Sequence, residues 1–540
     1  MINQRTGTLK LKKLTGKSQE QLNFNINEPP KTTANDLNKF LASIVQSLPP
    51  LSYEFPDIPV PFSLPHISPL DVVKKIEKLK RSSICPLDIP VPLIKAFSDY
   101  LSKPLSTLFN EITESGQFPQ YWKQGFITPI KKKNGKPGFD GIRPITLTSI
   151  FSKLYESFLA DWLKMKVLPL IDLRQFGNLK STSTSHYLIH LVDTMGKLLE
   201  KPNTWLNLIS IDLQKAFDLI NHNLLIDKLI NEFHIETFLV KLVASFLSNR
   251  SQAVKYLNCF SDHLPIFNGI PQGTILGPLL FSLMINSLST LYDNRWKFVD
   301  DLTVLEICHK NIFSNPMGIL QDIACEASSL DMTVNPSKSA IVSVSFLKSP
   351  PLFLAPIPPE TSVTSLKLLG VTISSNLKWD AHINNILRQA NSSLSLLKLL
   401  NKFSCPQSHL LQVYISFVRP ILEYACPVWH PGLSNEATQK IENVQKRALR
   451  IIFKEGMIPY LHLLNISNLE TLERRRNNLC LRFGKLALLN PRTANLFPEY
   501  HVPDRNRPPR TVSQPIPTLS PILCTTLRYK KSFIPFFLLI

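Results

Sequence analysis

Two adjacent aspartates stand between two apolar, β-prone segments at residues 297–305, which read KFVDDLTVL. Short apolar runs on either side of a polar centre predict a β-hairpin whose tip carries Asp300 and Asp301. Asp tolerates turn dihedrals, but its usual partner in such a turn is glycine, which is missing here. Two carboxylates at one tip also repel each other. A cation bound at the tip would explain this sequence, and an ordinary exposed turn is the alternative.

The composition indicates what kind of partner the chain binds. Its 540 residues suffice for several packed units, and the net charge of +20 favours a polyanion such as nucleic acid over an anionic membrane surface. The eight cysteines include no C-x-x-C pair, so no zinc ribbon or disulfide framework is predicted. The N-terminal segment lacks a secretory signal, and the apolar C-terminal SFIPFFLLI is too short to span a bilayer. An intracellular protein without membrane contact is expected.

Changes in proline content and in hydrophobic periodicity along the sequence predict four parts. Residues 1–65 form an N-terminal extension that ends in a proline-rich linker, residues 66–375 mix strands and helices, residues 376–490 are helical, and residues 491–540 form a proline-rich tail. Within the second part, residues 125–147 predict a hairpin with a basic tip at 131–138, and residues 150–165 and 278–291 predict helices. Since strands and helices mix without strict βαβ alternation, the predicted fold class is α+β.

A third aspartate ends a predicted strand. The apolar run TWLNLISID closes at Asp212, just before a polar turn. Two-metal phosphoryl transfer requires carboxylates that hold divalent ions about 3.5–4 Å apart, and magnesium prefers such oxygen ligands. If the two predicted strands are neighbours, Asp212 meets Asp300 and Asp301. The alternatives are a helix N-cap at Asp212 and, for the segment GIPQG at 269–273, a plain turn.

The order of these segments resembles that of reverse transcriptases. The segments ITPIKKKNGKPGFDGIRPITLTS, SIDLQKAFD, GIPQGTILGPLLFSLMIN, KFVDDLTV, MTVNPSKSAIV and LKLLGVTI are similar in sequence and order to their motifs, above all those of jockey-type non-LTR retrotransposons. The resemblance covers about residues 70–455. It implies a right-hand polymerase with fingers, a palm with an antiparallel sheet, and a helical thumb.

The resemblance also implies site residues. Asp212, Asp300 and Asp301 would be the catalytic triad, and Asp212, Asp300, Asp301 and the Leu213 carbonyl would hold two Mg²⁺ ions, with Mn²⁺ as the alternative metal. Phe217 would exclude a 2′-hydroxyl and so select deoxynucleotides. The nucleotide site would further contain Arg143 on the triphosphate, Gln272 and Gly273 beside the base, Val299 at the sugar, and Lys338 near the pyrophosphate. Nucleic-acid contacts would come from Lys131, Lys132, Lys133 and Arg250, although a basic loop is as often solvated surface.

Some residues depart from the family pattern. The family hairpin usually has alanine at the position of Val299, and Ser287 stands where an aspartate is usual. The implied activity is RNA-directed DNA synthesis on an RNA template with a DNA primer and dNTPs, within a ribonucleoprotein that moves between cytoplasm and nucleus. The rival interpretations are a catalytically decayed retroelement remnant that only binds nucleic acid, and an RNA-directed RNA polymerase. An upstream endonuclease is not expected within this sequence, and the sequence leaves the oligomeric state open.

Overall fold

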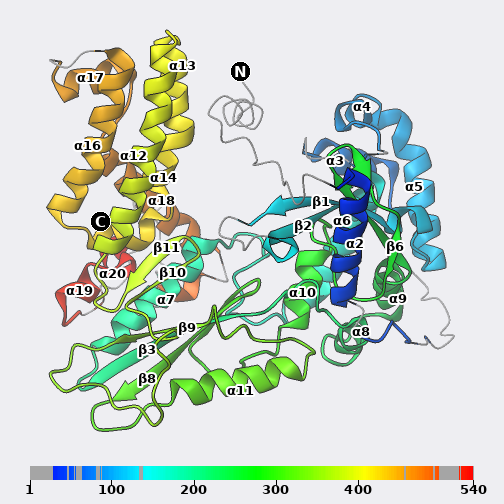
Figure 1. Ribbon diagram of the computed structural model, residues 1–540, viewed down its shortest axis with the longest axis horizontal. Coiled ribbons are helices and arrows are strands. Elements are labelled where there is room, and N and C mark those ends of the chain that lie inside the picture. The colour runs from blue at the N-terminus through cyan, green and yellow to red at the C-terminus, as the bar shows by residue number, and fades with distance from the viewer. Residues whose placement is uncertain are drawn as a thin grey trace, which may run out of the picture.

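The computed structural model describes residues 28–45, 48–53, 55, 64–80, 85–86, 88–132, 138–454, 458–490, 493–497, 522 and 524–538. Figure 1 shows a central strand-rich region, a second sheet with its helices to one side, and an upright group of helices on the other. Most of the predicted N-terminal extension, the hairpin tip at 133–137 and most of the predicted tail lie outside the described residues.

The central sheet has four antiparallel strands in the order β7 (Arg295–Phe298), β8 (Asp301–His309), β3 (Thr204–Asp212) and β9 (Ala340–Val344). Alternate side chains of β3 enter two different cores, with Ile209 and Ile211 in one and Leu206 in the other. Helices α10 (Gly277–Met284) and α11 (Pro316–Ser328) pack in the first core, and α7 (Thr184–Leu199) packs in the second. Both faces of this sheet are therefore covered.

The second sheet contains β1 (Gln124–Lys131), β2 (Ile142–Leu147), β4 (Arg250–Tyr256), β5 (Cys259–Phe260) and β6 (Leu264–Ile266). β1 pairs antiparallel with β2 and parallel with β4. The first core, which contains α10 and α11, also contains residues of α3 (Pro69–Glu77), α4 (Val91–Ala96), α5 (Ser98–Ser115), α6 (Ile150–Val167), α8 (His222–Asn231) and α9 (Thr237–Leu247). The predicted hairpin and the helix expected at 150–165 are confirmed.

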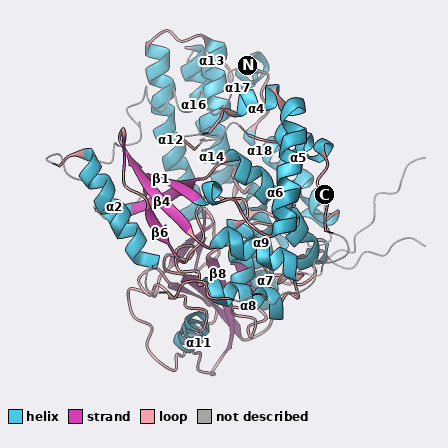
Figure 2. Cartoon of the chain, turned by 90° about the vertical axis from the view of Figure 1, so that its right-hand side faces the viewer, coloured by secondary structure: helices cyan, strands magenta, loops and turns pink. Residues whose placement is uncertain are grey.

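Helix α2 (Pro30–Val45), which sequence analysis did not predict, lies along β4, β5 and β6 (Figure 2). Buried Asn38 fixes it there, because Asn38 Nδ2 donates to the Gln252 carbonyl at 3.2 Å and Gln252 Nε2 donates back to Asn38 Oδ1 at 3.0 Å. The exposed ion pair Lys31–Asp262, at 2.6 Å, adds little. Part of the expected N-terminal extension is thus a packed helix.

The C-terminal part is helical after a short hairpin of β10 (Ser365–Leu368) and β11 (Val371–Ser374), as predicted. Its helices are α12 (Asp380–Lys402), α13 (Gln407–Val413), α14 (Arg419–Glu423), α15 (Cys426–Trp429), α16 (Asn435–Phe453), α17 (Tyr460–Ser467) and α18 (Leu472–Leu488). Two further short helices, α19 (Leu527–Lys530) and α20 (Phe533–Leu538), lie in the predicted tail and pack on α7, so this part of the tail is folded. None of the helices in the described part of the chain combines the length and apolar character that a membrane crossing requires.

The helix predicted at 278–291 is shorter than expected, because α10 ends at Met284. The carbonyls of Ile285 and Asn286, just beyond its end, accept hydrogen bonds from the Lys297 ammonium at 3.2 and 2.6 Å. This cation therefore caps carbonyls at the end of the helix. The Ser289 amide, which would continue the helix by donating to the Ile285 carbonyl, donates to Glu326 Oε2 at 2.8 Å instead.

Candidate active site

The carboxylates predicted to meet do meet. Asp212 at the end of β3 is the register partner of Asp301 at the start of β8. Side chains directly opposite each other in an antiparallel pair have Cβ atoms about 5 Å apart, so these two carboxylates share one face of the sheet end. Asp300 precedes Asp301 in the turn of the β7–β8 hairpin. Three carboxylates from two strands thus gather at one edge of the central sheet.

The hairpin turn consists of two residues, Val299 and Asp300, because Phe298 pairs with Asp301. Val299 has a φ of 59°, in the left-handed region, where a β-branched side chain is strained. The position that favours glycine is therefore Val299 rather than either aspartate. Gly177 permits this turn to come close, since a Cβ on Gly177 would lie 2.5 Å from the Val299 nitrogen.

The carboxylates disfavour one another's charge. Desolvation by the surrounding protein, together with repulsion from Asp300 and Asp212, raises the pKa of Asp301 to about 6. Desolvation and repulsion from Asp212 also raise the pKa of Asp300, while Arg143 and Lys338 oppose that rise. Both residues remain open to solvent at the tip, where a cation can reach them. No basic side chain among the described residues offsets the rise in the pKa of Asp301.

Three basic side chains face this edge from other elements. Lys338 Nζ lies 3.1 Å from Asp212 Oδ2, in an ion pair that is open to solvent. Arg143, on β2, acts electrostatically on both Asp300 and Lys132. Desolvation and repulsion from Lys338 and Arg143 lower the pKa of Lys132. The three cations therefore lie within electrostatic reach of one another, as a polyphosphate-binding site would require.

The Leu213 carbonyl has an orientation suited to the same edge. The Asp212 carbonyl accepts from the Asn335 amide at 2.7 Å, and the Gln214 amide donates to Thr333 at 2.7 Å. Because successive carbonyls of an extended chain point to opposite sides, the Leu213 carbonyl points away from residues 333–335. Within the described residues, no three His, Cys, Asp or Glu side chains already form a closed metal cluster. The mutually repelling carboxylates nevertheless have the oxygen-rich chemistry that a divalent cation prefers.

Three of the predicted nucleotide residues contact helix α10, Asp218 and strand β2. Phe217 is half-buried and stacks on Phe281 of α10, with ring centroids 4.6 Å apart and an interplanar angle of 17°. Gln272 Nε2 donates to Asp218 Oδ1 at 3.3 Å. A Cβ on Gly273 would lie 2.3 Å from the Thr146 carbonyl oxygen, so the close approach that requires glycine is to β2.

Arg250 corrects one expectation. Its side chain is 4% exposed, donates to the Phe246 carbonyl at 2.8 Å and lies over the Phe246 ring. Burial lowers its pKa to about 10. Arg250 therefore closes the end of α9 inside the protein and is not placed to touch a nucleic-acid backbone. Of the predicted basic loop, Lys131 and Lys132 are described, whereas Lys133 lies outside the described residues.

Sequence reasoning missed the segment that supports the hairpin from behind. Buried Gln175 accepts hydrogen bonds at Oε1 from the Gly177 amide at 2.9 Å and the Val299 amide at 3.4 Å. The segment QFG at 175–177 could have signalled a close backbone approach through its glycine. Its partner was not visible, since Val299 lies 122 positions after Gly177 in the chain.

The central sheet with carboxylates at its edge, the fingers-like second sheet and the helical C-terminal part define a right-hand polymerase fold. Residues 130–373 match the family described as "Reverse transcriptase (RNA-dependent DNA polymerase)", so the chain carries a reverse transcriptase domain. The resemblance inferred from the ordered motifs is confirmed, and so is the α+β fold class.

The relatives are retrotransposon polymerases. The chain is 27% identical over 427 residues to "Probable RNA-directed DNA polymerase from transposon BS" of Drosophila melanogaster, which covers 73% of this chain and 46% of the relative. It is 26% identical over 446 residues to "RNA-directed DNA polymerase from mobile element jockey" of the same species, covering 74% of this chain and 47% of the relative. The chain thus spans less than half the length of these relatives. A solved telomerase from Candida albicans is 13% identical, with a TM-score of 0.39, covering 69% of this chain and 71% of that one.

Proposed function

We propose that this chain is an RNA-directed DNA polymerase of a non-LTR retrotransposon, which extends a primer 3′-hydroxyl with deoxynucleoside triphosphates on an RNA template. The observation that carries the proposal is the pairing of Asp212 with Asp301 across two neighbouring strands, with Asp300 beside them and cations facing them. This arrangement lies inside the segment that matches reverse transcriptases. The names of the relatives are consistent with the same activity.

The carboxylates suit a pair of divalent ions, Mg²⁺ or alternatively Mn²⁺. Asp212, Asp300 and Asp301 would hold them together with the Leu213 carbonyl. When bound, such ions lower the pKa of the attacking hydroxyl and neutralise the leaving group. Lys338, now paired with Asp212, would exchange part of that contact for the phosphate oxygens of the nucleotide. Arg143 would orient the triphosphate from the opposite sheet.

Substrate choice would depend on the residues around the sugar and base. Phe217, fixed by its stack on Phe281, would close the space that a 2′-hydroxyl needs. Val299 would lie at the primer end and the sugar, and Gln272 with Gly273 would lie beside the base. Lys131 and Lys132, together with Lys133, would contact the nucleic-acid backbone. Residues 66–375 would form fingers and palm, 376–490 the thumb, 1–65 an extension and 491–540 a tail.

The net charge of +20 would favour phosphate-mediated binding of template and primer, with steep salt dependence. We infer partners consisting of an RNA template, a DNA primer and the element RNA in a ribonucleoprotein. The life cycle of such elements implies assembly in the cytoplasm and copying in the nucleus.

A decayed remnant that only binds nucleic acid is the competing interpretation. The purified chain should extend a DNA primer on an RNA template with Mg²⁺, and should prefer dNTPs over ribonucleotides. Binding of the template–primer without incorporation above that of Asp300→Asn would favour the remnant. Equal use of ribonucleotides would favour an RNA polymerase.

A further inference from the structure

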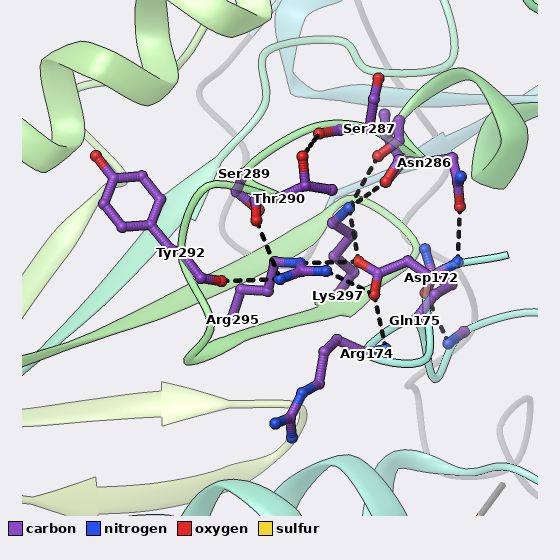
Figure 3. A network of polar contacts seen from close by, with 12 residues as sticks. Asp172, Arg174, Gln175, Asn286, Ser287, Ser289, Thr290, Tyr292, Arg295 and Lys297 are labelled. Atoms are coloured by element: carbon purple, nitrogen blue, oxygen red, sulfur yellow. Dashed lines mark hydrogen bonds and ion pairs between the residues drawn. The ribbon is translucent and has the colours of Figure 1, made fainter. Parts of the chain in front are cut away.

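A lysine is buried in the strand that leads to the candidate catalytic turn. Lys297, three residues before Asp300, is 1% exposed, and its Nζ lies 3.0 Å from Asp172 Oδ2 (Figure 3). Asp172 also binds Arg295 through two hydrogen bonds of 3.0 Å, one to each carboxylate oxygen. A charged lysine in the interior costs free energy unless its contacts compensate, so this position calls for an explanation.

The same ammonium holds the end of helix α10. Lys297 Nζ donates to the Asn286 carbonyl at 2.6 Å and to the Ile285 carbonyl at 3.2 Å, where the helix dipole favours a cation. The other end of this eight-residue helix follows the turn that carries Gln272 and Gly273. At about 1.5 Å per residue, α10 is a rod of about 12 Å between that turn and Lys297.

The backbone of Lys297 is held on both sides. In β7 it pairs with Leu302 of β8, and on the other edge its carbonyl accepts from the Phe176 amide at 2.9 Å while its amide donates to the Arg174 carbonyl at 3.0 Å. The same segment, residues 174–177, contains Gln175, whose Oε1 accepts a hydrogen bond from the Val299 amide. The lysine thus lies where the hairpin, the support segment and α10 meet.

We propose that Lys297 and Asp172 are positioning residues, which set the catalytic hairpin tip relative to the turn at Gln272 and Gly273. This inference rests on the proposed function. The Lys297 ammonium connects the end of α10, the helix that follows the turn at Gln272 and Gly273, to β7. β7 is the strand that leads to Asp300 and Asp301. Gln175 transmits the same constraint to the strained Val299.

A positioning role predicts a selective defect. In Lys297→Met, the apolar side chain keeps the volume but releases the α10 carbonyls and leaves Asp172 with Arg295 and the Arg174 amide. Because misplacement by about 1 Å can reduce a rate about a hundredfold, the single-turnover rate of incorporation should fall at least about tenfold. The affinity for template–primer should stay unchanged, and the Mg²⁺ concentration for half-maximal rate should rise.

The matched control is Lys123→Met. Lys123 is also a buried lysine, 5% exposed, but it lies in the short helix before β1 (Gln120–Lys123), away from this network. Amide hydrogen exchange of the full chain, measured without nucleotide or metal, gives a readout independent of activity. Lys297→Met should speed exchange in peptides covering 295–302 and 172–177, whereas Lys123→Met should leave those peptides unchanged.

Normal exchange of the hairpin and a normal rate in Lys297→Met would overturn the proposal. So would exchange raised evenly across the chain in both lysine variants, because that pattern is general destabilisation. If Lys297→Met does not fold, Gln175→Leu carries the test, since it removes the acceptor of the Val299 amide without changing charge. Faster exchange confined to 295–302 supports the proposal, and unchanged exchange overturns it. A wild-type chain without any incorporation would contradict the proposed function, whereas the exchange results would still decide the positioning role.

Discussion

Asp212, the last residue of β3, lies directly opposite Asp301, the first residue of β8. The pairing joins two segments that are almost ninety positions apart in the chain, and it places Asp300 at the adjoining turn. Desolvation and repulsion within this group raise the pKa of Asp301 to about 6. A site that disfavours its own negative charge is one that a divalent cation stabilises.

Arg143 should control nucleotide affinity. Replacing it with alanine removes the paired donors that would grip the triphosphate, so KM for dNTP should rise about tenfold or more. Arg143→Lys should recover only part of the loss, because an ammonium lacks the planar fork. Steady-state incorporation measures both, with Lys103→Ala on the exposed side of α5 as the control. Equal KM values for wild type and Arg143→Ala would remove Arg143 from the nucleotide site.

Phe217 should control sugar selection. In Phe217→Ala the ring that stacks on Phe281 is lost, and the space next to the sugar opens. The ratio of kcat/KM for dNTP over the matching ribonucleotide should fall about tenfold or more. Phe281→Leu removes the stacking partner but keeps the Phe217 ring, so it should lower this ratio less than Phe217→Ala does. Unchanged discrimination in Phe217→Ala would refute the assignment.

Val299 stores strain in the turn. Its φ of 59° suits glycine, so Val299→Gly should raise the melting temperature or leave it unchanged, despite the entropy that glycine adds to the unfolded chain. Val299→Thr keeps the branched Cβ and should bring no such relief. Thermal unfolding of the three proteins makes the comparison. Marked destabilisation by glycine would mean that side-chain packing of Val299 outweighs the strain.

Acid should destabilise the fold through buried histidines. His222 is 1% exposed, and burial lowers its pKa to about 4, against a hydrogen bond to the Gly269 carbonyl that raises it. A depressed pKa means that the unfolded chain binds the proton first, so stability present above about pH 6.5 is lost as the pH falls toward 4. At about 1.4 kcal/mol per pH unit, His222 accounts for up to about 3 kcal/mol.

Thermal unfolding at pH 7 and pH 5 measures this effect. The melting temperature of the wild type should be lower at pH 5, and the difference should be smaller in His222→Gln, whose amide can still donate to Gly269. The same direction of pKa shift holds for His186, His190, His382 and His430, so part of the acid sensitivity should remain in the variant. Identical pH dependence in the two proteins would contradict the role of His222.

Local patterns were sufficient to predict the strands that carry the carboxylates. The apolar run before Asp212 predicted β3, and the apolar segments on either side of Asp300 and Asp301 predicted the β7–β8 hairpin. Both predictions were possible because strand patterns are short-range signals. Their register, which brings Asp212 opposite Asp301, depends on pairing between distant segments. Only the ordered motifs, through their resemblance to reverse transcriptases, indicated that the two strands are neighbours.

Tertiary contacts explain what the sequence did not reveal. Arg250 looked like a surface cation, but its guanidinium finds a carbonyl and a ring inside the protein. Lys297 stands between apolar Trp296 and Phe298, and no local pattern indicates that its charge is buried against Asp172. Helix α2 escaped prediction for a similar reason, since its position depends on its contact with β4.

The most direct test of the central claim is primer extension on an RNA template with dNTPs and Mg²⁺, comparing the full wild-type chain with Asp300→Asn. If the three carboxylates support two-metal nucleotidyl transfer, the wild type extends the primer, the variant is slower by at least about a hundredfold, and both bind the template–primer equally. Equal incorporation by the two proteins, or none by either at concentrations where both bind the template–primer, would contradict the account.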